Sequence, residues 1–203
     1  KAAPRGVINL HGGPLPRYRG GSPLNWQIIR GEARVGISVI QLDEGIDTGA
    51  ILAEGETEIN SIDTISDIHE WANEVFPRLV LKVLHQFDCG KCQGRIQDES
   101  EAEYWHQRTD EDGQIDWRNN TAREIHNLVR GVTRPFPGAF LMFGDYKVTI
   151  WDAVPFDNQL NFNYYGLGQV IRKVKNKLII KLDGGSLLIN EYECDVEIKE
   201  GDE

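Results

Sequence analysis

The sequence has 203 residues, 40% of them hydrophobic, and its 32 acidic and 22 basic side chains give a formal net charge of −10. This composition fits a globular protein that buries a core as one large domain or two small ones, and the acidic balance argues against nucleic acid as a partner, because clustered Lys and Arg hold a phosphate backbone. No apolar run approaches the ~18 residues typical of a membrane span, and the N-terminus lacks a signal-peptide pattern, so we expect a cytoplasmic protein without a membrane partner.

Strands alternate with helices in the first half of the chain. GVINL is a short apolar run typical of a buried strand, and Ser22 followed by Pro23 is a helix-start signal. In chain order, the predicted elements are a strand at 6–10, a helix at 23–30, strands at 35–42 and 50–59, and a long amphipathic helix at 63–87. Strands separated by helices predict an α/β domain with a parallel or mixed sheet.

The second half of the chain has a different character. After Gly90 the sequence becomes polar and acidic, which predicts a linker. Thr121 and Glu124 then form a capping box, which predicts a short helix that ends at Gly131. Beyond RPFPG, short β-rich runs separated by turns predict a small antiparallel β-domain, an OB-like barrel. We therefore expect an α/β domain at 1–103, a linker at 104–120 and a helix with the β-domain at 121–203.

The cysteines and histidines predict neither disulfides nor a metal site. Three cysteines are an odd number and cannot form a complete disulfide framework, which fits a reducing compartment. Cys89 and Cys92 form a CxxC at the end of a predicted helix, and no second pair completes a four-ligand zinc site. We expect no metal.

Three polar residues at strand ends are the first candidates for chemistry. Asn9 and His11 lie two apart at the end of a predicted strand, so their side chains share a face. Asp47, in the loop between two predicted strands, is placed to hydrogen-bond His11. The plain alternatives are that Asn9 and His11 are satisfied polar residues at a sheet end and that Asp47 closes an Asx turn. An amide, an imidazole and a carboxylate together suit direct acyl transfer to an amine, with His11 moving protons, Asn9 donating to the oxyanion and Asp47 orienting His11.

Longer motifs around these residues resemble a known family. NLHGGPLPRYRG and the downstream LDEGIDTGAIL resemble the signature of formyltransferases that use 10-formyltetrahydrofolate. RTDEDGQIDW, HNLVR and RPFPGAF resemble the linker and C-terminal β-domain of methionyl-tRNA formyltransferase and its relatives. The match is closest to enzymes that formylate amino sugars on nucleotides, including the domain that acts on UDP-4-amino-4-deoxyarabinose.

The resemblance implies a partial Rossmann-like formyltransferase domain and specific site residues. It places the family's catalytic asparagine, histidine and aspartate on Asn9, His11 and Asp47, and it implies roles in lipopolysaccharide or O-antigen biosynthesis. Family members carry roughly a further half domain before this first strand, so 1–103 corresponds to the C-terminal part of the catalytic domain and we expect the chain to be a fragment. The implied folate loop, whose backbone groups hold the pterin, consists of Leu42, Asp43, Glu44, Gly45, Ile46 and Asp47.

Three further residues are weaker candidates for substrate binding. Arg17 and Arg19 lie in a loop beside the expected site, where they can meet a pyrophosphate or a folate carboxylate or, equally, pair with surface acids. Phe136 can stack on a base or pack in a turn. The resulting hypothesis is a formyltransferase that acts on a nucleotide-linked amino sugar, with a homodimer as the candidate assembly. The alternatives are a methionyl-tRNA formyltransferase and a non-catalytic binding or dimerisation module.

Overall fold

The computed structural model describes residue 3 and residues 6–160 and 162–203, and it divides the chain into two compact units. The first unit comprises 1–28 and 32–108, and the second comprises 29–31 and 109–203. The division between Arg108 and Thr109 falls inside the stretch predicted as a linker. Residues just before this division therefore pack with the first unit.

A three-stranded sheet forms the centre of the first unit. Its strands, in the order β1-β3-β4, are β1 (Ile8–His11), β3 (Arg34–Gln41) and β4 (Ile51–Glu58). Both neighbouring pairs run antiparallel. The predicted mixture of strands and helices is confirmed, but the parallel or mixed direction expected for this sheet is wrong. The helix between β1 and β3 has seven residues and spans about 10 Å, too little to carry the chain back along the eight-residue β3.

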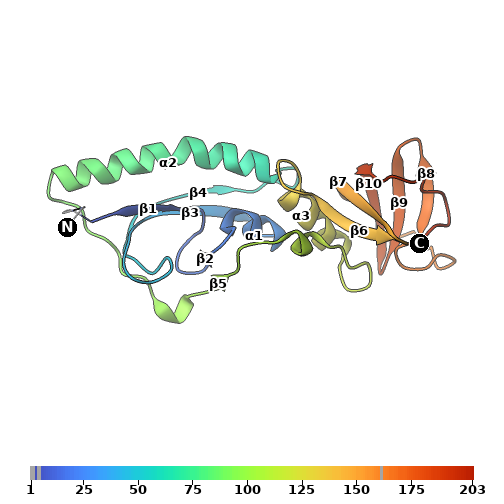
Figure 1. Cartoon of the computed structure of the whole chain (residues 1–203), viewed down its shortest axis with the longest axis horizontal. Helices are drawn as coiled ribbons and strands as arrows, with labels where there is room; N and C mark the ends of the chain where they lie inside the picture. Colours follow the sequence, from blue (N-terminus) through green and yellow to red (C-terminus); the bar gives the residue numbers. More distant parts are fainter. Residues whose placement is uncertain (1–2, 4–5, 161) are drawn as a thin grey trace. The chain divides into compact units, whose positions relative to one another are not determined.

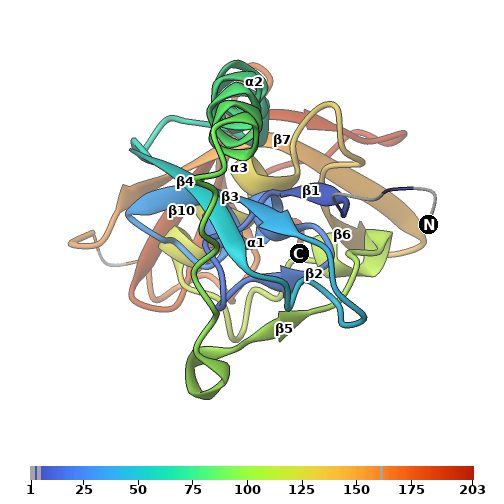
Figure 2. The ribbon, with the colours of Figure 1, turned by 90° about the vertical axis from the view of Figure 1, so that its left-hand side faces the viewer.

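Helices lie on both sides of this sheet. Helix α2 (Ile65–Asp88) lies along one face, and α1 (Pro23–Ile29) lies on the other side, beside a short parallel pair of strands, β2 (Arg19–Gly20) and β5 (Tyr104–Trp105) (Figures 1 and 2). A short 3-10 helix (Glu99–Glu101) precedes β5. Among the described residues, no helix combines the length and the apolar character needed to cross a membrane.

The long helix follows its predicted bounds closely. Thr64 and Asp67 form a capping box at its start, which satisfies backbone groups that the first turn leaves without partners. Its buried Val83 packs in one apolar cluster with Val39 of β3 and with Leu52 and Ala53 of β4. This packing fixes the sheet whose strand ends carry the candidate site.

The second unit is an antiparallel sheet covered by a helix, as predicted. A 3-10 helix (Asp110–Gly113) leads to α3 (Ala122–Val132), which begins at the predicted Thr121–Glu124 capping box. The sheet order β6-β7-β10-β9-β8 leaves β6 and β8 as edges, so the sheet is open where a barrel was expected. Helix α3 continues through Gly131, contrary to prediction, because fully buried Val132 extends its apolar face. The strands are β6 (Ala139–Phe143), β7 (Tyr146–Asp157), β8 (Val170–Val174), β9 (Lys177–Leu182) and β10 (Gly185–Glu193).

Candidate active site

His11 is the last residue of β1 and is almost fully buried, with 5% of its surface exposed. It lies opposite Ser38 of β3 in the strand register. The Ser38 hydroxyl donates to the carbonyl of Gly13 at 2.8 Å, and the side-chain amide of Gln27 donates to the carbonyl of Gly12 at 2.8 Å. Two buried polar side chains therefore hold the loop that follows His11, which fixes the direction in which the imidazole projects.

Both ring nitrogens of His11 face oxygen atoms. Nε2 lies 2.6 Å from the main-chain oxygen of Tyr18. Because a carbonyl can only accept, Nε2 carries the proton of this hydrogen bond. Nδ1 lies 3.4 Å from Oδ2 of Asp47. Nδ1 is therefore the ring nitrogen that faces the carboxylate, while the Tyr18 carbonyl holds the ring in place.

Asp47 reaches His11 from an unusual backbone conformation. Its φ is +53°, in the left-handed region that non-glycine residues rarely adopt. In this conformation Oδ2 accepts a hydrogen bond of 2.9 Å from the backbone N–H of Gly20 and lies beside His11, while 12% of the side chain remains exposed. Asp47 therefore lies close enough to His11 to orient it, and this role stays a prediction. The Asp47 carboxylate contacts two groups, whereas a simple Asx turn would give it one.

Asn9 lies on β1 two residues before His11 and is half-buried, with Leu10 between them 46% exposed. This alternation puts the amide and the imidazole on the same face of the strand. Asn9 pairs with Ile40 in the register of the sheet. Its predicted donation to an oxyanion stays a prediction.

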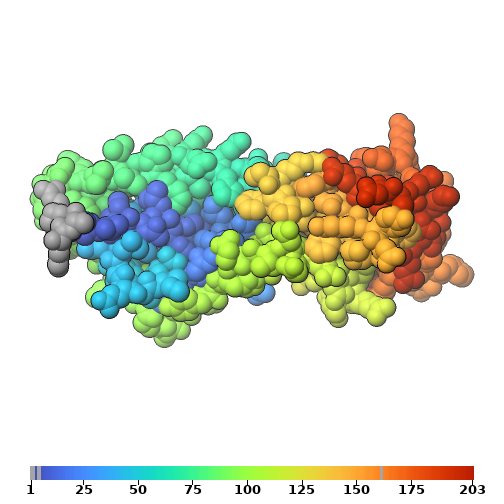
Figure 3. All heavy atoms as spheres, viewed as in Figure 1, coloured from blue at the N-terminus to red at the C-terminus, as the bar shows by residue number. Residues whose placement is uncertain are grey.

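The predicted folate loop is exposed over five of its six residues, and the light-blue atoms of this stretch reach the surface in Figure 3. Leu42 and Ile46 expose 45% and 66% of their surface, so two apolar side chains are open to a ligand. Asp43 accepts hydrogen bonds from Thr48 Oγ1 at 2.6 Å and from the N–H of Gly45 at 3.1 Å. The bond from Thr48 lowers the pKa of Asp43. The exposed start of the loop is therefore shaped by its own side chains, whereas its last residue, Asp47, is bound by groups outside the loop.

The three weaker candidates lie in different surroundings. Arg17 is exposed and pairs with Glu32 at 3.0 Å. Arg19 is completely buried, and each of its five N–H groups donates to an oxygen of the protein. An anion could therefore bind Arg19 only in place of these internal partners. Phe136 lies in the second unit, half-buried between α3 and β6, and its stacking role stays a prediction.

One residue that sequence reasoning missed is Gln97. It is buried, with 5% of its surface exposed, although the stretch QDESEAEYW around it is polar and acidic. Its partners are main-chain carbonyls of the loop that ends in Asp47 and Gly49, and the buried Arg19. No side-chain pattern in the sequence records a contact to carbonyls, so no signal was available to find it.

Gly13 is required for the contact between His11 and Tyr18. A Cβ atom at this position would lie 2.8 Å from both His11 Nε2 and the Tyr18 oxygen. We therefore expect Gly13→Ala to displace the imidazole and to lower kcat by about 100-fold, the effect of a displacement of about 1 Å at a reacting group. Steady-state kinetics of the acyl transfer that the sequence predicts measures this.

The matched control for Gly13→Ala is Gly166→Ala in the second unit. A Cβ there meets only Glu203 side-chain atoms, the nearer at 3.7 Å, an ordinary contact distance. We expect wild-type kinetics from this variant. Equal kinetics of the two alanine variants would contradict the role of Gly13.

A hollow of about 740 Å³ lies in the second unit and does not include the His11–Asp47 pair. Its lining includes apolar core residues such as Val148, Leu178 and Ile189, together with the acidic Asp116 and Asp202. The candidate site in the first unit is therefore defined by converging polar groups and not by the size of a cavity.

Comparison with known proteins gives a consistent assignment for both halves of the chain. Residues 1–84 match the family model for formyl transferase, and residues 108–197 match the model for the formyl transferase C-terminal domain. Together these matches cover most of the sequence and both compact units.

Solved structures with the same fold include three relatives at low identity. The N-formyltransferase from Helicobacter canadensis, solved with folinic acid and dTDP-3-aminofucose, is 20% identical, with a TM-score of 0.72 over 90% of this chain and 65% of that chain. HypX from Aquifex aeolicus in complex with tetrahydrofolic acid is 22% identical, with a TM-score of 0.69 over 91% of this chain and 31% of that one. Methionyl-tRNA formyltransferase from Clostridium thermocellum is 24% identical, with a TM-score of 0.56 over 96% and 69% of the respective chains. This chain thus spans less than two thirds of the first two proteins.

Proposed function

The chain belongs to the formyl transferase family, and on this basis we propose that it transfers a formyl group from 10-formyltetrahydrofolate to the primary amine of a nucleotide-linked amino sugar. The observation that carries the proposal is the contact of 3.4 Å between His11 Nδ1 and Asp47 Oδ2. Two structural neighbours were solved with a folate, and one of them also with dTDP-3-aminofucose. These complexes support both a folate and a nucleotide sugar as substrates.

The proposed reaction is a direct acyl transfer. The amine nitrogen attacks the formyl carbon, a new C–N bond forms, and the bond between that carbon and N10 of the folate breaks. The amine loses one proton and N10 gains one, so a single group that accepts and returns a proton is sufficient. Because the Tyr18 carbonyl holds the Nε2 proton, we assign this exchange to His11 Nδ1 and the Asp47 carboxylate. Asn9 donates to the oxygen that becomes negative during the attack.

The charge of the chain supports a small substrate. An acidic chain with a net charge of −10 is a poor match for the phosphate backbone of a tRNA, which needs a basic surface. A nucleotide sugar carries only a pyrophosphate, for which one or two local cations are enough. The exposed Arg17 is the candidate for this contact.

To test this, the intact protein is incubated with 10-formyltetrahydrofolate and a panel of nucleotide 3-amino and 4-amino sugars, and in parallel with methionyl initiator tRNA. Mass spectrometry then measures the masses of the sugars and of the tRNA. We expect one sugar to gain the mass of a formyl group in place of a hydrogen. Formylation of the tRNA alone would replace this proposal with methionyl-tRNA formyltransferase. Formylation of neither would favour a non-catalytic binding or dimerisation module.

A further inference from the structure

A segment that follows the long helix contacts both loops of the proposed site. This segment, the strap, comprises residues 95–105. At its start, Arg95 exchanges two backbone hydrogen bonds with Ile51, at 2.8 and 2.9 Å. At its end, β5 pairs with β2 in the loop that follows His11. The strap therefore lies against the loop that carries Asp47 and against the loop that carries Tyr18 and Gly20.

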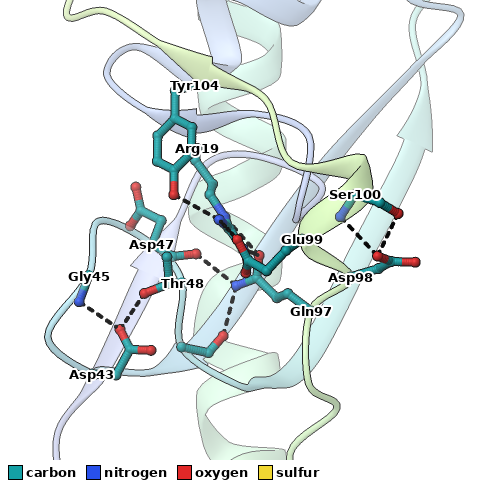
Figure 4. Close-up of polar contacts among 11 residues, drawn as sticks. Arg19, Asp43, Gly45, Asp47, Thr48, Gln97, Asp98, Glu99, Ser100 and Tyr104 are labelled. Carbon is teal, nitrogen blue, oxygen red and sulfur yellow. Dashed lines mark hydrogen bonds and ion pairs between the residues drawn. The ribbon is translucent and has the colours of Figure 1, made fainter.

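Gln97 is the strap residue that reaches Asp47 (Figure 4). Its Nε2 donates to the main-chain oxygens of Asp47 at 2.7 Å and of Gly49 at 2.8 Å. Its Oε1 accepts from Nε and Nη2 of Arg19 at 3.0 and 2.9 Å. Since arginine can only donate and carbonyls can only accept, the orientation of this amide is fixed chemically. Gln97 is thus a rigid bridge between Arg19 and the main chain of Asp47.

Arg19 occupies a position that ties the bridge to the proposed site. Its two chain neighbours supply the backbone contacts there: the Tyr18 carbonyl holds His11, and the Gly20 N–H holds the Asp47 carboxylate. The guanidinium itself is anchored by Glu99 at 2.6 and 2.9 Å and by the Tyr104 hydroxyl at 2.8 Å, both on the strap (Figure 4). Gly20 therefore contacts the carboxylate of Asp47 directly through its N–H, and Arg19 contacts the main-chain oxygen of Asp47 indirectly through Gln97.

We infer that Gln97 is a positioning residue for Asp47: oriented by Arg19, it holds the main chain of Asp47 at φ +53° so that the carboxylate meets both Gly20 and His11. A left-handed aspartate costs free energy and persists only where its surroundings fix it. The catalytic consequence of this inference rests on the proposed function. The positioning of Asp47 can be measured without turnover, through the hydrogen bond from Gly20 to its carboxylate.

The first test is structural. Gln97→Glu is nearly isosteric and keeps an acceptor for Arg19, but it places a carboxylate oxygen against two carbonyl oxygens. In the intact protein labelled with ¹⁵N-glycine, we expect the Gly20 amide proton to shift upfield and to exchange faster, because it loses its bond to Asp47. If the charged variant does not fold, Gln97→Met removes the same two donors without a charge.

The matched control is Gln169→Glu. Gln169 also donates its amide to a main-chain oxygen, that of Gly201 at 2.7 Å, but it lies in the second unit. We expect the Gly20 resonance of this variant to equal that of the wild type. A Gly20 amide that is unchanged in folded Gln97→Glu or Gln97→Met would overturn the inference.

The second test is kinetic and separates the inference from the proposed function. We expect Gln97→Glu to lower kcat by about 100-fold with little change in KM. Added to Asp47→Asn, the same change should lower the remaining kcat by less than about twofold, because both changes act through the Asp47 carboxylate. A full additional loss in Asp47→Asn would overturn the inference. Unchanged turnover of Asp47→Asn with a shifted Gly20 amide in Gln97→Glu would leave the positioning intact and refute the catalytic role of Asp47.

Discussion

Replacing His11 with asparagine in the intact protein should lower kcat for formyl transfer by about 100-fold to 10,000-fold, the range expected when a proton-transfer group is removed. Asparagine places its amide near the position of Nδ1, beside Asp47, and is too short to reach the Tyr18 carbonyl that Nε2 contacts in the wild type. What it lacks is a nitrogen that takes and returns a proton beside Asp47. Asp47→Asn should cause a loss of similar size, because the neutral amide no longer shares that proton.

Steady-state kinetics over a range of pH measures this effect. In the wild type the profile of kcat/KM should contain a limb that disappears in His11→Asn, since that limb reports a proton on the free enzyme. The matched control is His85→Asn, a histidine in the last turn of α2 whose side chain is exposed and contacts Cys89 Sγ at 3.7 Å. His85→Asn should behave as the wild type. A profile of unchanged shape in His11→Asn would refute the assignment.

The sequence predicted the elements of the fold better than their arrangement. The helix expected at 63–87 is observed at Ile65–Asp88, because apolar residues at helical spacing record a face that is buried against a sheet. Strand direction was predicted wrongly for β1, β3 and β4, since alternation along one strand says nothing about the direction of its partner. Closure of the second sheet is likewise a property of pairing between edges, which no single strand encodes.

In the candidate site, too, the sequence predicts some residues and not others. His11 and Asp47 were found because they lie in motifs at strand ends, and the structure brings them to 3.4 Å across 36 positions of sequence, 47 minus 11. Arg19 was identified as a candidate from its charge, but its burial depends on Glu99 and Tyr104, about 80 residues away. Gln97 was missed because its contacts to main-chain oxygens leave no pattern of residue types. Residues that act by contacting the backbone are thus the ones for which a structure was needed.

Arg19→Met should lower the free energy of unfolding by about 3 kcal/mol, because it removes a fully buried cation and leaves buried Gln97 Oε1 without its donors. Methionine fills a similar length of the cavity, so the loss is mainly that of charged hydrogen bonds. Urea unfolding of the intact protein at neutral pH measures the change. The same variant should also show the upfield shift of the Gly20 amide expected for Gln97→Glu, since Gln97 is no longer oriented.

The matched control for Arg19→Met is Arg17→Met, two residues away in the sequence. Arg17 also pairs with a glutamate, but its side chain is 46% exposed, and an exposed pair contributes less than about 1 kcal/mol. Arg17→Met should therefore unfold almost as the wild type does, and equal losses in the two variants would contradict the burial argument.

The free energy of unfolding should also depend on pH through the pair of Arg19 and Glu99. The hydrogen bond from Arg19 lowers the pKa of Glu99 below its ordinary 4.5. The stability from this pair is therefore complete above pH 4.5 and is lost as the pH falls through the lower pKa of the folded protein. In Arg19→Met that acid-dependent part should be absent, so the difference in stability between wild type and variant should narrow as the pH is lowered.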